Sequence, residues 1–332
     1  MRKVVALGIL TCLLASMLLY VAPIEQFTEE DAEPMNNPRL IPDSELTQGQ
    51  RNALMSSGLS RGTSTDWSVS GGSLNNDEIY EMIFDSQGNI VICGSIYQVS
   101  QFGSITIEPE GEGDILMAKL STSGTWIWAL TAGTPSYYDE CRGITIDSND
   151  HVYGTGYLRG QVDFGNITIN STGFDGWMAR INSSTGSFDW AMKFGGFDVD
   201  VGWDLACDKW DNLFVTGYYQ NLSEFGNTQL LSPSNENARF FIAYYNFTLN
   251  NFQWAKHATA GGESASSIPF QIVVDKVTNH AYVAGYNTGS ESWSGRFTSN
   301  APSVYAGFVI KYNDTGYLEW GRYIGGTSCF LS

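Results

Sequence analysis

The three histidines of the chain are the first candidates for catalysis or for metal binding. His151 follows a predicted turn, His257 lies in a segment led by a tryptophan, and His280 begins a predicted strand. No two of them have the short spacing at which histidines share a zinc ion. The sequence therefore predicts neither a zinc site nor a histidine-based active site.

A group of aspartates offers the next candidate for metal binding. Asp198 and Asp200 are followed by Asp204, a spacing that resembles a calcium-binding loop. The segment lacks the central glycine and the closing glutamate that such loops use. We expect these three side chains to be solvated turn carboxylates, and we predict no metal ion.

A second set of aspartates recurs at the same place in successive repeats, as Asp85, Asp147 and Asp208. The side chain of an aspartate at the start of a turn accepts a hydrogen bond from the backbone two residues further on, which closes an Asx turn. A residue that recurs in every repeat is typical of a requirement of the fold. We therefore interpret these aspartates as structural.

Pairs of carboxylates are a further source of chemistry, because glycoside hydrolysis uses two of them. With 35 Asp and Glu residues, some pair is bound to lie at a suitable distance, yet the linear sequence selects none. There is also no Gly-x-Ser-x-Gly elbow, no P-loop and no dinucleotide-binding glycine motif. We predict no catalytic residue and no cofactor.

Aromatic residues are better candidates for contacts with a ligand, since the chain has ten Trp, seventeen Tyr and eighteen Phe. Five tryptophans belong to the repeat pattern described below and are expected to pack between repeats. Aromatics outside that pattern are free to stack on a sugar: Trp177, Trp203, Trp210, Tyr218 and Trp293. Packing in the core is the alternative for each of them.

Modification sites are suggested by six Asn-x-Ser/Thr sequons, Asn166, Asn170, Asn182, Asn221, Asn246 and Asn313. The cysteines beyond the first apolar segment are Cys93, Cys141, Cys207 and Cys329, and they occupy different positions in the repeat. No disulfide framework follows from them. Cys93 and Cys207 lie in apolar runs, which favours buried thiols, while a disulfide between repeats stays open for an exported protein.

An internal repeat organises these groups. Trp67, Trp128, Trp190, Trp254 and Trp320 are 61, 62, 64 and 66 residues apart, and glycine follows each within seven residues. A second register begins at the turn aspartates, with Asp275 in the fourth repeat, and reaches a glycine nine or ten residues later: Gly94, Gly156, Gly217 and Gly285. Registers that keep the same phase predict equivalent structural units.

Each unit contains about four apolar runs of strand length, separated by turns rich in Gly, Asp, Asn and Ser. Short antiparallel strands with periodic glycine and aromatic residues predict an all-β chain in which each unit is a four-stranded blade of a β-propeller. A solenoid of the same units is the alternative.

The third unit carries a resemblance to a known family. Trp190-Ala191-Met192-Lys193-Phe194-Gly195-Gly196 is followed by the segment 208–217 and by Phe225-Gly226. This pattern resembles the SBBP-type β-propeller repeats of exported bacterial and archaeal proteins, and the resemblance extends from about Thr65 to the end of the chain. It implies a propeller at or beyond the cell surface, without shared catalytic residues. The fourth unit departs from it, since Trp293-Ser294 stands where Phe-Gly is expected.

The N-terminal part differs from the repeats in composition. Arg2 and Lys3 precede an uncharged run at 4–21, so residues 1–22 are expected to be a signal peptide or, preferably, an uncleaved membrane anchor. Residues 23–64 are expected to be a disordered acidic and polar linker. The propeller repeats occupy 65–332, as units of approximately 65–125, 126–187, 188–251 and 252–317 and a partial unit at 318–332.

The partial unit predicts an incomplete ring. It contains a tryptophan and a Gly-Gly pair but none of the later strands, so a sheet edge would stay exposed. The alternative is that the strand of Trp320 pairs with the first unit and closes a ring of four blades.

The charge of the chain restricts its partners. With 17 Lys and Arg against 35 Asp and Glu, the net charge is -18, which excludes nucleic-acid binding through a basic surface. We expect an exported or membrane-anchored protein that binds a surface carbohydrate or protein through loops on one face of the propeller, without catalysis. Two alternatives stay open: a polysaccharide hydrolase or lyase with carboxylates near the propeller axis, and a structural component of the cell surface.

Overall fold

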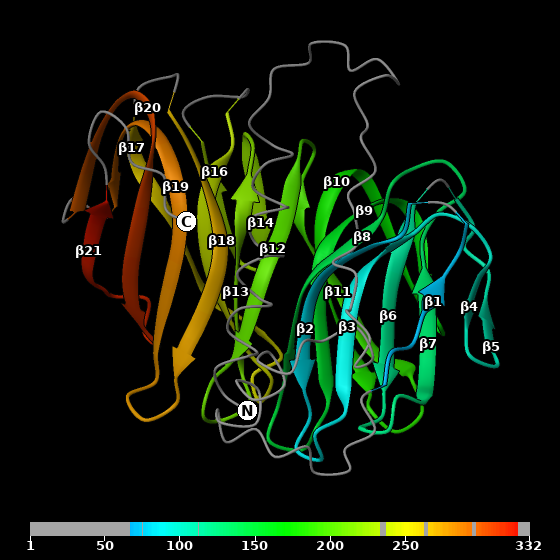
Figure 1. Ribbon diagram of the computed structural model, residues 1–332. Helices are drawn as coiled ribbons and strands as arrows, with labels where there is room; N and C mark the ends of the chain where they lie inside the picture. Colours follow the sequence, from blue (N-terminus) through cyan, green and yellow to red (C-terminus); the bar gives the residue numbers. More distant parts are fainter. Residues whose placement is uncertain are drawn as a thin grey trace, which may run out of the picture. The chain divides into compact units, whose positions relative to one another are not determined.

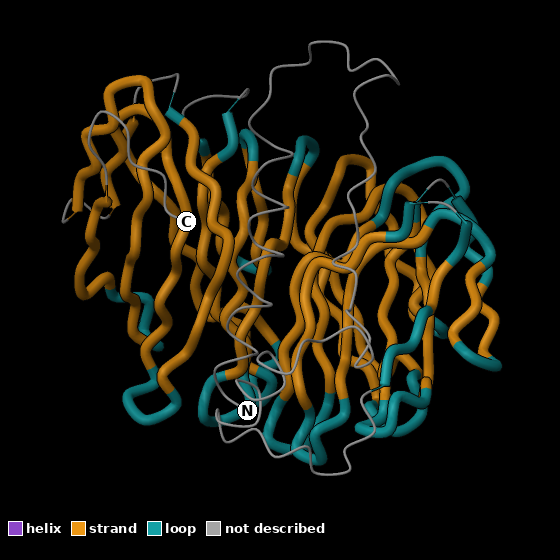
Figure 2. Tube along the Cα trace, in the orientation of Figure 1, coloured by secondary structure: helices purple, strands orange, loops and turns teal. Residues whose placement is uncertain are grey.

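The computed structural model describes residues 67–74, 76–111, 113–232, 237–261, 265–293 and 297–324. These residues contain β-strands joined by turns, and no helix (Figures 1 and 2), which confirms the all-β prediction for this part of the chain. The expected signal or anchor at 1–22, the expected linker at 23–64 and Cys329 lie outside the described residues. Within those residues, no apolar helix is long enough to span a membrane.

The main strands form successive groups of four antiparallel strands in chain order, each called a sheet below, although hydrogen bonds between segments join the third and fourth groups into one eight-stranded sheet. The first sheet contains β2 (Glu78–Phe84), β3 (Ile90–Ile96), β6 (Asp114–Leu120) and β7 (Trp126–Ala132). The second contains β8 (Glu140–Ile146), β9 (Val152–Phe164), β10 (Ile167–Asn182) and β11 (Ser187–Gly196). The third contains β12 (Asp200–Cys207), β13 (Leu213–Tyr219), β16 (Arg239–Asn246) and β17 (Asn251–Gly261). The fourth contains β18 (Ser266–Asp275), β19 (His280–Trp293), β20 (Phe297–Asn313) and β21 (Leu318–Ile324).

Short hairpins occur between the second and third strands of two sheets. They are formed by β4 (Ser100–Phe102) with β5 (Ile105–Ile107) and by β14 (Leu222–Phe225) with β15 (Thr228–Leu231). Each hairpin follows the second strand of its own sheet but pairs with the preceding segment: β4 with β1 (Gly71–Gly72), and β14 with the end of β11. The end of β19 pairs with β17 in the same way. Backbone hydrogen bonds of β14 and of the end of β19 therefore connect successive sheets, whereas β4 and β5 form a separate three-stranded sheet with β1.

The sheets and the sequence repeat differ in phase by one strand. Trp128, Trp190, Trp254 and Trp320 lie in the last strand of a sheet, whereas the sequence repeat begins at these residues. The strand of Trp320 pairs with β20 and completes the fourth sheet. The alternative in which it pairs with the first unit is therefore wrong, and among the described strands none joins the first sheet to the fourth.

Trp128, Trp190 and Trp254 lie between sheets, as predicted, whereas Trp67 is 41% exposed and Trp320 contacts Tyr282 of its own sheet. The Trp128 indole donates a hydrogen bond from Nε1 to the carbonyl oxygen of Ser183 in the next sheet, at 2.9 Å. Gly186, in the same turn, has a φ of 68°, and a Cβ there would lie 2.6 Å from the Trp128 ring. Between the third and fourth sheets, Trp254 makes the same two contacts, with Asp314 and Gly316. The facing turn needs glycine because a side chain at that position would overlap the tryptophan ring.

The turn aspartates close Asx turns, which confirms that prediction. Asp85 Oδ1 accepts hydrogen bonds from the backbone N–H of Gln87 at 2.9 Å and of Asn89 at 2.8 Å. Asp147 and Asp208 accept the corresponding bonds in the second and third sheets. These aspartates therefore have a structural role.

Hydrophobic clusters contain buried residues from consecutive sheets. The first cluster contains Cys93 from the first sheet and Cys141 from the second, and the next one contains Cys207. All three are buried free thiols, as expected for Cys93 and Cys207. The stability of this part of the chain therefore rests on packing between sheets, and no disulfide joins these three residues.

Candidate functional site

Each sheet carries a β-bulge at the same place in its first strand. The register shifts between Ile79 and Glu81 in β2, and the equivalent shifts recur in β8, β12 and β18. The extra residues are Tyr80, Arg142, Trp203 and Phe270. A bulge leaves one residue out of the ladder and redirects its side chain, so all four sheets present one large side chain from equivalent positions.

The glycine register of the sequence accounts for these bulges. A Cβ at Gly156 in β9 would lie 1.8 Å from the carbonyl oxygen of Glu140, and one at Gly217 in β13 would lie 1.8 Å from that of Val201. Gly94 and Gly285 face the first strands of their own sheets in the same way. Only glycine allows the bulged strand to approach its partner so closely.

The four bulge residues lie side by side, and we call them the aromatic row. The Arg142 guanidinium carbon lies 4.0 Å from the ring centroid of Tyr80 and 5.2 Å from that of Trp203. The Trp203 centroid is in turn 6.0 Å from that of Phe270. The row thus runs across the first strands of all four sheets, with one cation between aromatic rings.

Tyrosines from the second strands lie next to the row. Tyr218 is 6.0 Å from Trp203 between ring centroids, and Tyr286 is 5.3 Å from Phe270. The Tyr157 ring centroid lies 5.9 Å from the Arg142 guanidinium carbon. Burial raises the pKa of Tyr157 well above its ordinary value, and the Glu140 carboxylate adds to this effect. Tyr157 therefore stays neutral and able to donate a hydrogen bond.

The charge of Arg142 is balanced within the row. Its Nη2 lies 2.5 Å from Glu140 Oε2, and the two side chains are 18% and 8% exposed. Burial alone lowers the pKa of Arg142, but Glu140, Tyr80 and Tyr157 together outweigh burial and raise it above its ordinary value. The row thus combines stacking surfaces with a neutral ion pair, an arrangement that suits an uncharged polar ligand.

Two carboxylates directly follow row residues, the half-buried Glu81 and the buried Asp204, and both serve to join sheets. Glu81 Oε2 accepts a hydrogen bond from the backbone N–H of Ile144 at 2.7 Å, and Asp204 Oδ2 accepts one from Ile272 at 2.7 Å. Burial raises the pKa of Glu81 to about 7 and that of Asp204 well above its ordinary value. Each group thus accepts a backbone hydrogen bond from within the first strand of the following sheet.

The structure separates the five aromatics expected to contact a ligand. Trp203 and Tyr218 lie together in and beside the aromatic row. Trp177 and Trp293 are fully buried in the clusters between sheets, so their rings are not accessible to a ligand. Trp210 is 57% exposed in the turn after β12, at the far end of that strand from Trp203, with Lys209 Nζ 4.3 Å from its ring centroid.

Sequence reasoning did not select Tyr80, Arg142 or Phe270. The signal that finds them is the turn aspartate, because each row residue lies five positions before Asp85, Asp147, Asp208 or Asp275. A bulge changes the alternation of side chains within a strand, and a strict period of two assigns such residues to the wrong face.

Three aspartates expected to be solvated do not form one loop site. Asp200 and Asp204 are buried, so the expectation of solvated turn carboxylates is wrong for them. Asp204 accepts the hydrogen bond from Ile272 of β18 described above, and Asp198 Oδ2 accepts one from Asn221 Nδ2 at 2.9 Å. Among the described residues, no three His, Cys, Asp or Glu side chains are grouped for metal binding.

The sequons divide into exposed and engaged asparagines. Asn166 and Asn170 are exposed on the hairpin between β9 and β10. The other four are half-buried, and their side chains make hydrogen bonds in turns: Asn182, Asn221, Asn246 and Asn313. Glycans are most easily accommodated at the exposed pair.

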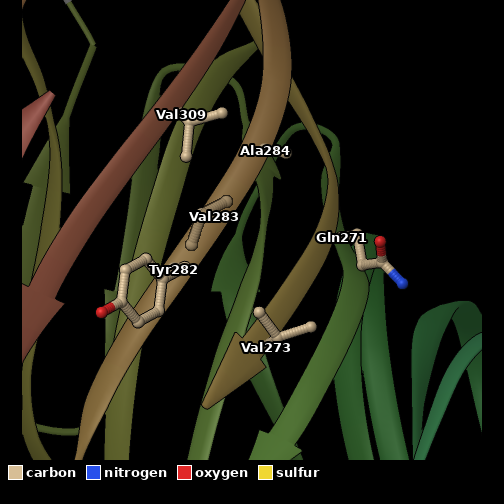
Figure 3. A pocket seen from close by; sticks show the side chains of 6 residues that line it. All are labelled: Gln271, Val273, Tyr282, Val283, Ala284 and Val309. Carbon is tan, nitrogen blue, oxygen red and sulfur yellow. The ribbon is translucent and has the colours of Figure 1, made fainter. Parts of the chain in front are cut away.

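Two small hollows lie outside the row. One, of about 130 Å³, is lined by side chains of the fourth sheet that include Val273, Tyr282 and Val309 (Figure 3). The other, of about 230 Å³, is polar and lies at the turns of the first and second sheets, beside Asp85 and Lys119. Both fall below the usual volume of a ligand pocket, so the aromatic row is the stronger candidate site.

In sequence, the chain is similar to a repeat-containing protein. No family model matches the chain. In sequence, it is 22% identical over 236 residues to an uncharacterized WD repeat-containing protein of Acanthamoeba polyphaga mimivirus, a match that covers 60% of this chain and 17% of that protein. The chain therefore spans less than a fifth of that relative. A quinohemoprotein alcohol dehydrogenase of Pseudomonas putida aligns in structure with a TM-score of 0.28 and 9% identity, over 64% of this chain and 52% of that one.

Proposed function

We propose that the chain is a surface or exported β-propeller protein of the SBBP type, which binds an extended carbohydrate through the aromatic row without catalysing its cleavage. The observation that carries this proposal is the recurrence of the bulge. Because all four first strands bulge at the same position, Tyr80, Arg142, Trp203 and Phe270 lie side by side. Neighbouring groups in the row are separated by 4.0, 5.2 and 6.0 Å.

The chemistry of the row favours a neutral, hydroxyl-rich ligand. Aromatic rings present flat apolar surfaces for the C–H faces of sugars, while tyrosine hydroxyls and the Arg142–Glu140 pair supply donors and acceptors. The net charge of -18 disfavours polyanionic ligands. A row that crosses four sheets is better matched to a chain of sugar units than to a single one.

The arrangement of carboxylates favours binding over hydrolysis. Glycosidases use one carboxylic acid and one carboxylate that both reach the scissile bond. Glu81 and Asp204 accept backbone hydrogen bonds from neighbouring sheets, and Glu140 is paired with Arg142. A hydrolase would need to release one of these groups from its partner.

A glycan array screened with the full chain tests the proposal, followed by calorimetry with the polysaccharide that binds. Trp203→Ala is expected to weaken binding about 5- to 150-fold, since stacking contributes about 1–3 kcal/mol per ring. Trp210→Ala is the matched control, because it removes a more exposed tryptophan at the far end of the same strand, and it should leave affinity unchanged. Release of reducing sugars would favour the hydrolase, and an array without any bound glycan would favour the structural component.

The place of the protein at the cell surface rests on the sequence and needs its own test. Sequencing the amino terminus of the protein recovered from membranes distinguishes an anchor from a cleaved signal. Recovery of Met1 or Arg2 is expected. A new terminus between residues 15 and 30 would instead indicate a cleaved signal peptide.

A further inference from the structure

Three positions of the repeat meet wherever one sheet contacts the next. The first is the start of the third strand of one sheet, and the second is the start of the first strand of the following sheet. The third lies in the segment after the second strand of that following sheet, where it pairs back with the preceding sheet. Between the second and third sheets these positions hold Asp175, Asp200 and Ser223, and between the third and fourth sheets they hold Arg239, Ser267 and Glu291. The same backbone geometry thus carries two different sets of side chains.

Between the third and fourth sheets, a cation and an anion are buried together. Arg239 Nη1 lies 2.6 Å from Glu291 Oε1, and the two side chains are 1% and 0% exposed. Ser267 Oγ donates a hydrogen bond to the same carboxylate oxygen at 3.1 Å. The charges of this contact cancel.

Between the second and third sheets, two buried carboxylates occur without a buried cation. Asp175 and Asp200 are both fully buried. Lys193 Nζ contacts Asp175 Oδ2 from a side chain that is 39% exposed, and the N–H of Gly196 donates to Asp200 Oδ2 at 2.8 Å. Asp175 Oδ1 and Asp200 Oδ1 have no hydrogen-bond partner. A buried carboxylate with an unsatisfied oxygen costs stability, so this contact calls for a further cation.

The third member of the contact supplies another unsatisfied oxygen. Ser223 is fully buried, and its hydroxyl faces Asp200 but lies outside hydrogen-bonding geometry. At the equivalent place between the first and second sheets stands Val162. Asp114 there also has an unpartnered Oδ1, but both oxygens of Asp139 accept backbone hydrogen bonds at 2.8 Å, from Thr134 and Arg159. The unsatisfied hydroxyl is therefore particular to the contact between the second and third sheets.

The carboxylates converge over a glycine. A Cβ at Gly195 would lie 2.5 Å from Asp175 Oδ1 and 2.9 Å from Asp200 Oδ2. Gly195 has a φ of 134°, and its lack of a side chain lets the two carboxylates approach the same point. The donors that meet there are oxygens, which are the ligands preferred by Ca²⁺, whereas Zn²⁺ prefers nitrogen and sulfur.

We propose that Asp175, Asp200 and Ser223 bind a calcium ion, which neutralises the contact between the second and third sheets as Arg239 neutralises the contact between the third and fourth. Carbonyl oxygens of the adjoining backbone and water complete the coordination, since Ca²⁺ takes six to eight oxygen ligands. The ion links β10, β12 and β14, and so fastens two sheets to each other.

Thermal unfolding of the full chain tests this site, after treatment with EDTA and dialysis, with CaCl₂ or MgCl₂ added back. For a Kd of about 10⁻⁴ M, 10 mM Ca²⁺ should raise Tm by about 5 °C, and Mg²⁺ should raise it less. Calorimetric titration with CaCl₂ should give one ion per chain. A Tm and a heat signal that do not respond to Ca²⁺ would overturn the proposal.

Variants locate the response. Asp200→Asn should abolish the Ca²⁺-dependent rise in Tm, and Ser223→Ala should weaken Ca²⁺ binding several-fold while the chain still folds. Asp139→Asn is the matched control, because it changes the equivalent aspartate between the first and second sheets and should retain the full rise. An equal response in Asp200→Asn, or equal loss in Asp139→Asn, would refute the assignment.

A second variant keeps the test decisive if the single changes unfold the chain. The triple variant Asp175→Arg, Asp200→Ser and Ser223→Glu transfers the side chains of the third and fourth sheets to the second and third. It is expected to fold in EDTA and to show no rise in Tm with Ca²⁺. A triple variant that still responds to Ca²⁺ would place the ion elsewhere.

Discussion

The contact between the second and third sheets and the contact between the third and fourth sheets place the same three backbone positions together with different charges. One holds Asp175, Asp200 and Ser223, and the other holds Arg239, Ser267 and Glu291. The hairpin pairing that forms both contacts is similar, since β14 pairs with β11 and the end of β19 pairs with β17. The repeat therefore fixes where these side chains meet, but not how their charges are compensated.

The comparison also shows that the three positions change as a set. An arginine at the position of Asp175 would be unfavourable beside Ser223. Between the third and fourth sheets this position holds Arg239, and the hairpin position there holds Glu291. Buried charges impose this coupling, because a single exchange leaves an ion without a partner. The strands themselves need no such coordination, since any apolar residue of suitable size continues their packing.

The largest effect is expected when the compensated contact is broken. Arg239→Met leaves Glu291 buried without its cation and should lower the free energy of unfolding by about 3–5 kcal/mol. Chemical denaturation followed by circular dichroism measures it. The double change Arg239→Met with Glu291→Met removes both charges and should recover most of the loss. A single variant as stable as the double variant would show that the pair contributes little.

The sequence predicted the parts of this architecture that depend on local chemistry. Asp85 and its equivalents close Asx turns, and Trp128 packs on the next sheet, because turn closure and the burial of an indole follow from residue type and spacing. The aromatic row was found only in part, as Trp203, since a bulge breaks the alternation from which a strand is interpreted. Asp200 was expected in solvent because its partners lie 25 residues before it and 23 after it, on other strands.

The pH dependence of stability distinguishes the two contacts next. Burial raises the pKa of Asp200 from 3.8 to about 7, and the charges of Asp175 and Asp198 add to this effect. An acid whose pKa is higher in the folded state stabilises that state while protonated, so its contribution is complete below about pH 4 and is lost as the pH rises through 7. In EDTA, the free energy of unfolding should therefore fall between pH 4.5 and 8 in both proteins. The fall in Asp200→Asn should be about 3 kcal/mol smaller than the fall in the parent chain.

Urea titrations at pH 4.5, 6 and 8 measure this difference directly. Other acids with raised pKa values, such as Glu81 and Asp139, contribute a decline in the same direction, so the informative quantity is the difference between the two proteins. Parallel curves for the chain and for Asp200→Asn would show that Asp200 does not titrate in this range.

A smaller effect is expected where contacts between sheets depend on shape instead of charge. Gly186→Ala places a methyl group 2.6 Å from the Trp128 ring, and the residue has a φ of 68°, so we expect a loss of about 2–3 kcal/mol. Gly165 has a φ of 65° and no atom within 4 Å of its Cβ position, which makes Gly165→Ala the matched control with a loss of about 1 kcal/mol. Equal values of ΔΔG in urea titrations would mean that the backbone conformation alone decides the cost.

The smallest effect is expected at the turns, where the first and second sheets are linked by an exposed side chain. Asp150 Oδ1 accepts a hydrogen bond from the backbone N–H of Ser86 at 2.9 Å, although its φ is 63°, a conformation that favours glycine. Asp211 accepts the same kind of bond from Ser148 at 2.9 Å in the next contact, and Asn279 accepts one from Lys209 at 3.2 Å in the contact after that. The first turn has Gly88 at this position.

Asp150→Gly should therefore cost only about 0.5–1 kcal/mol, because the lost hydrogen bonds are partly offset by relief of the positive φ. Asp150→Asn retains an acceptor and should stay within about 0.3 kcal/mol of the parent chain. Differential scanning calorimetry of both variants resolves this order. If Asp150→Gly proves more stable than Asp150→Asn, the turn contact does not hold the sheets together, and charge compensation and core packing must account for the cohesion between them.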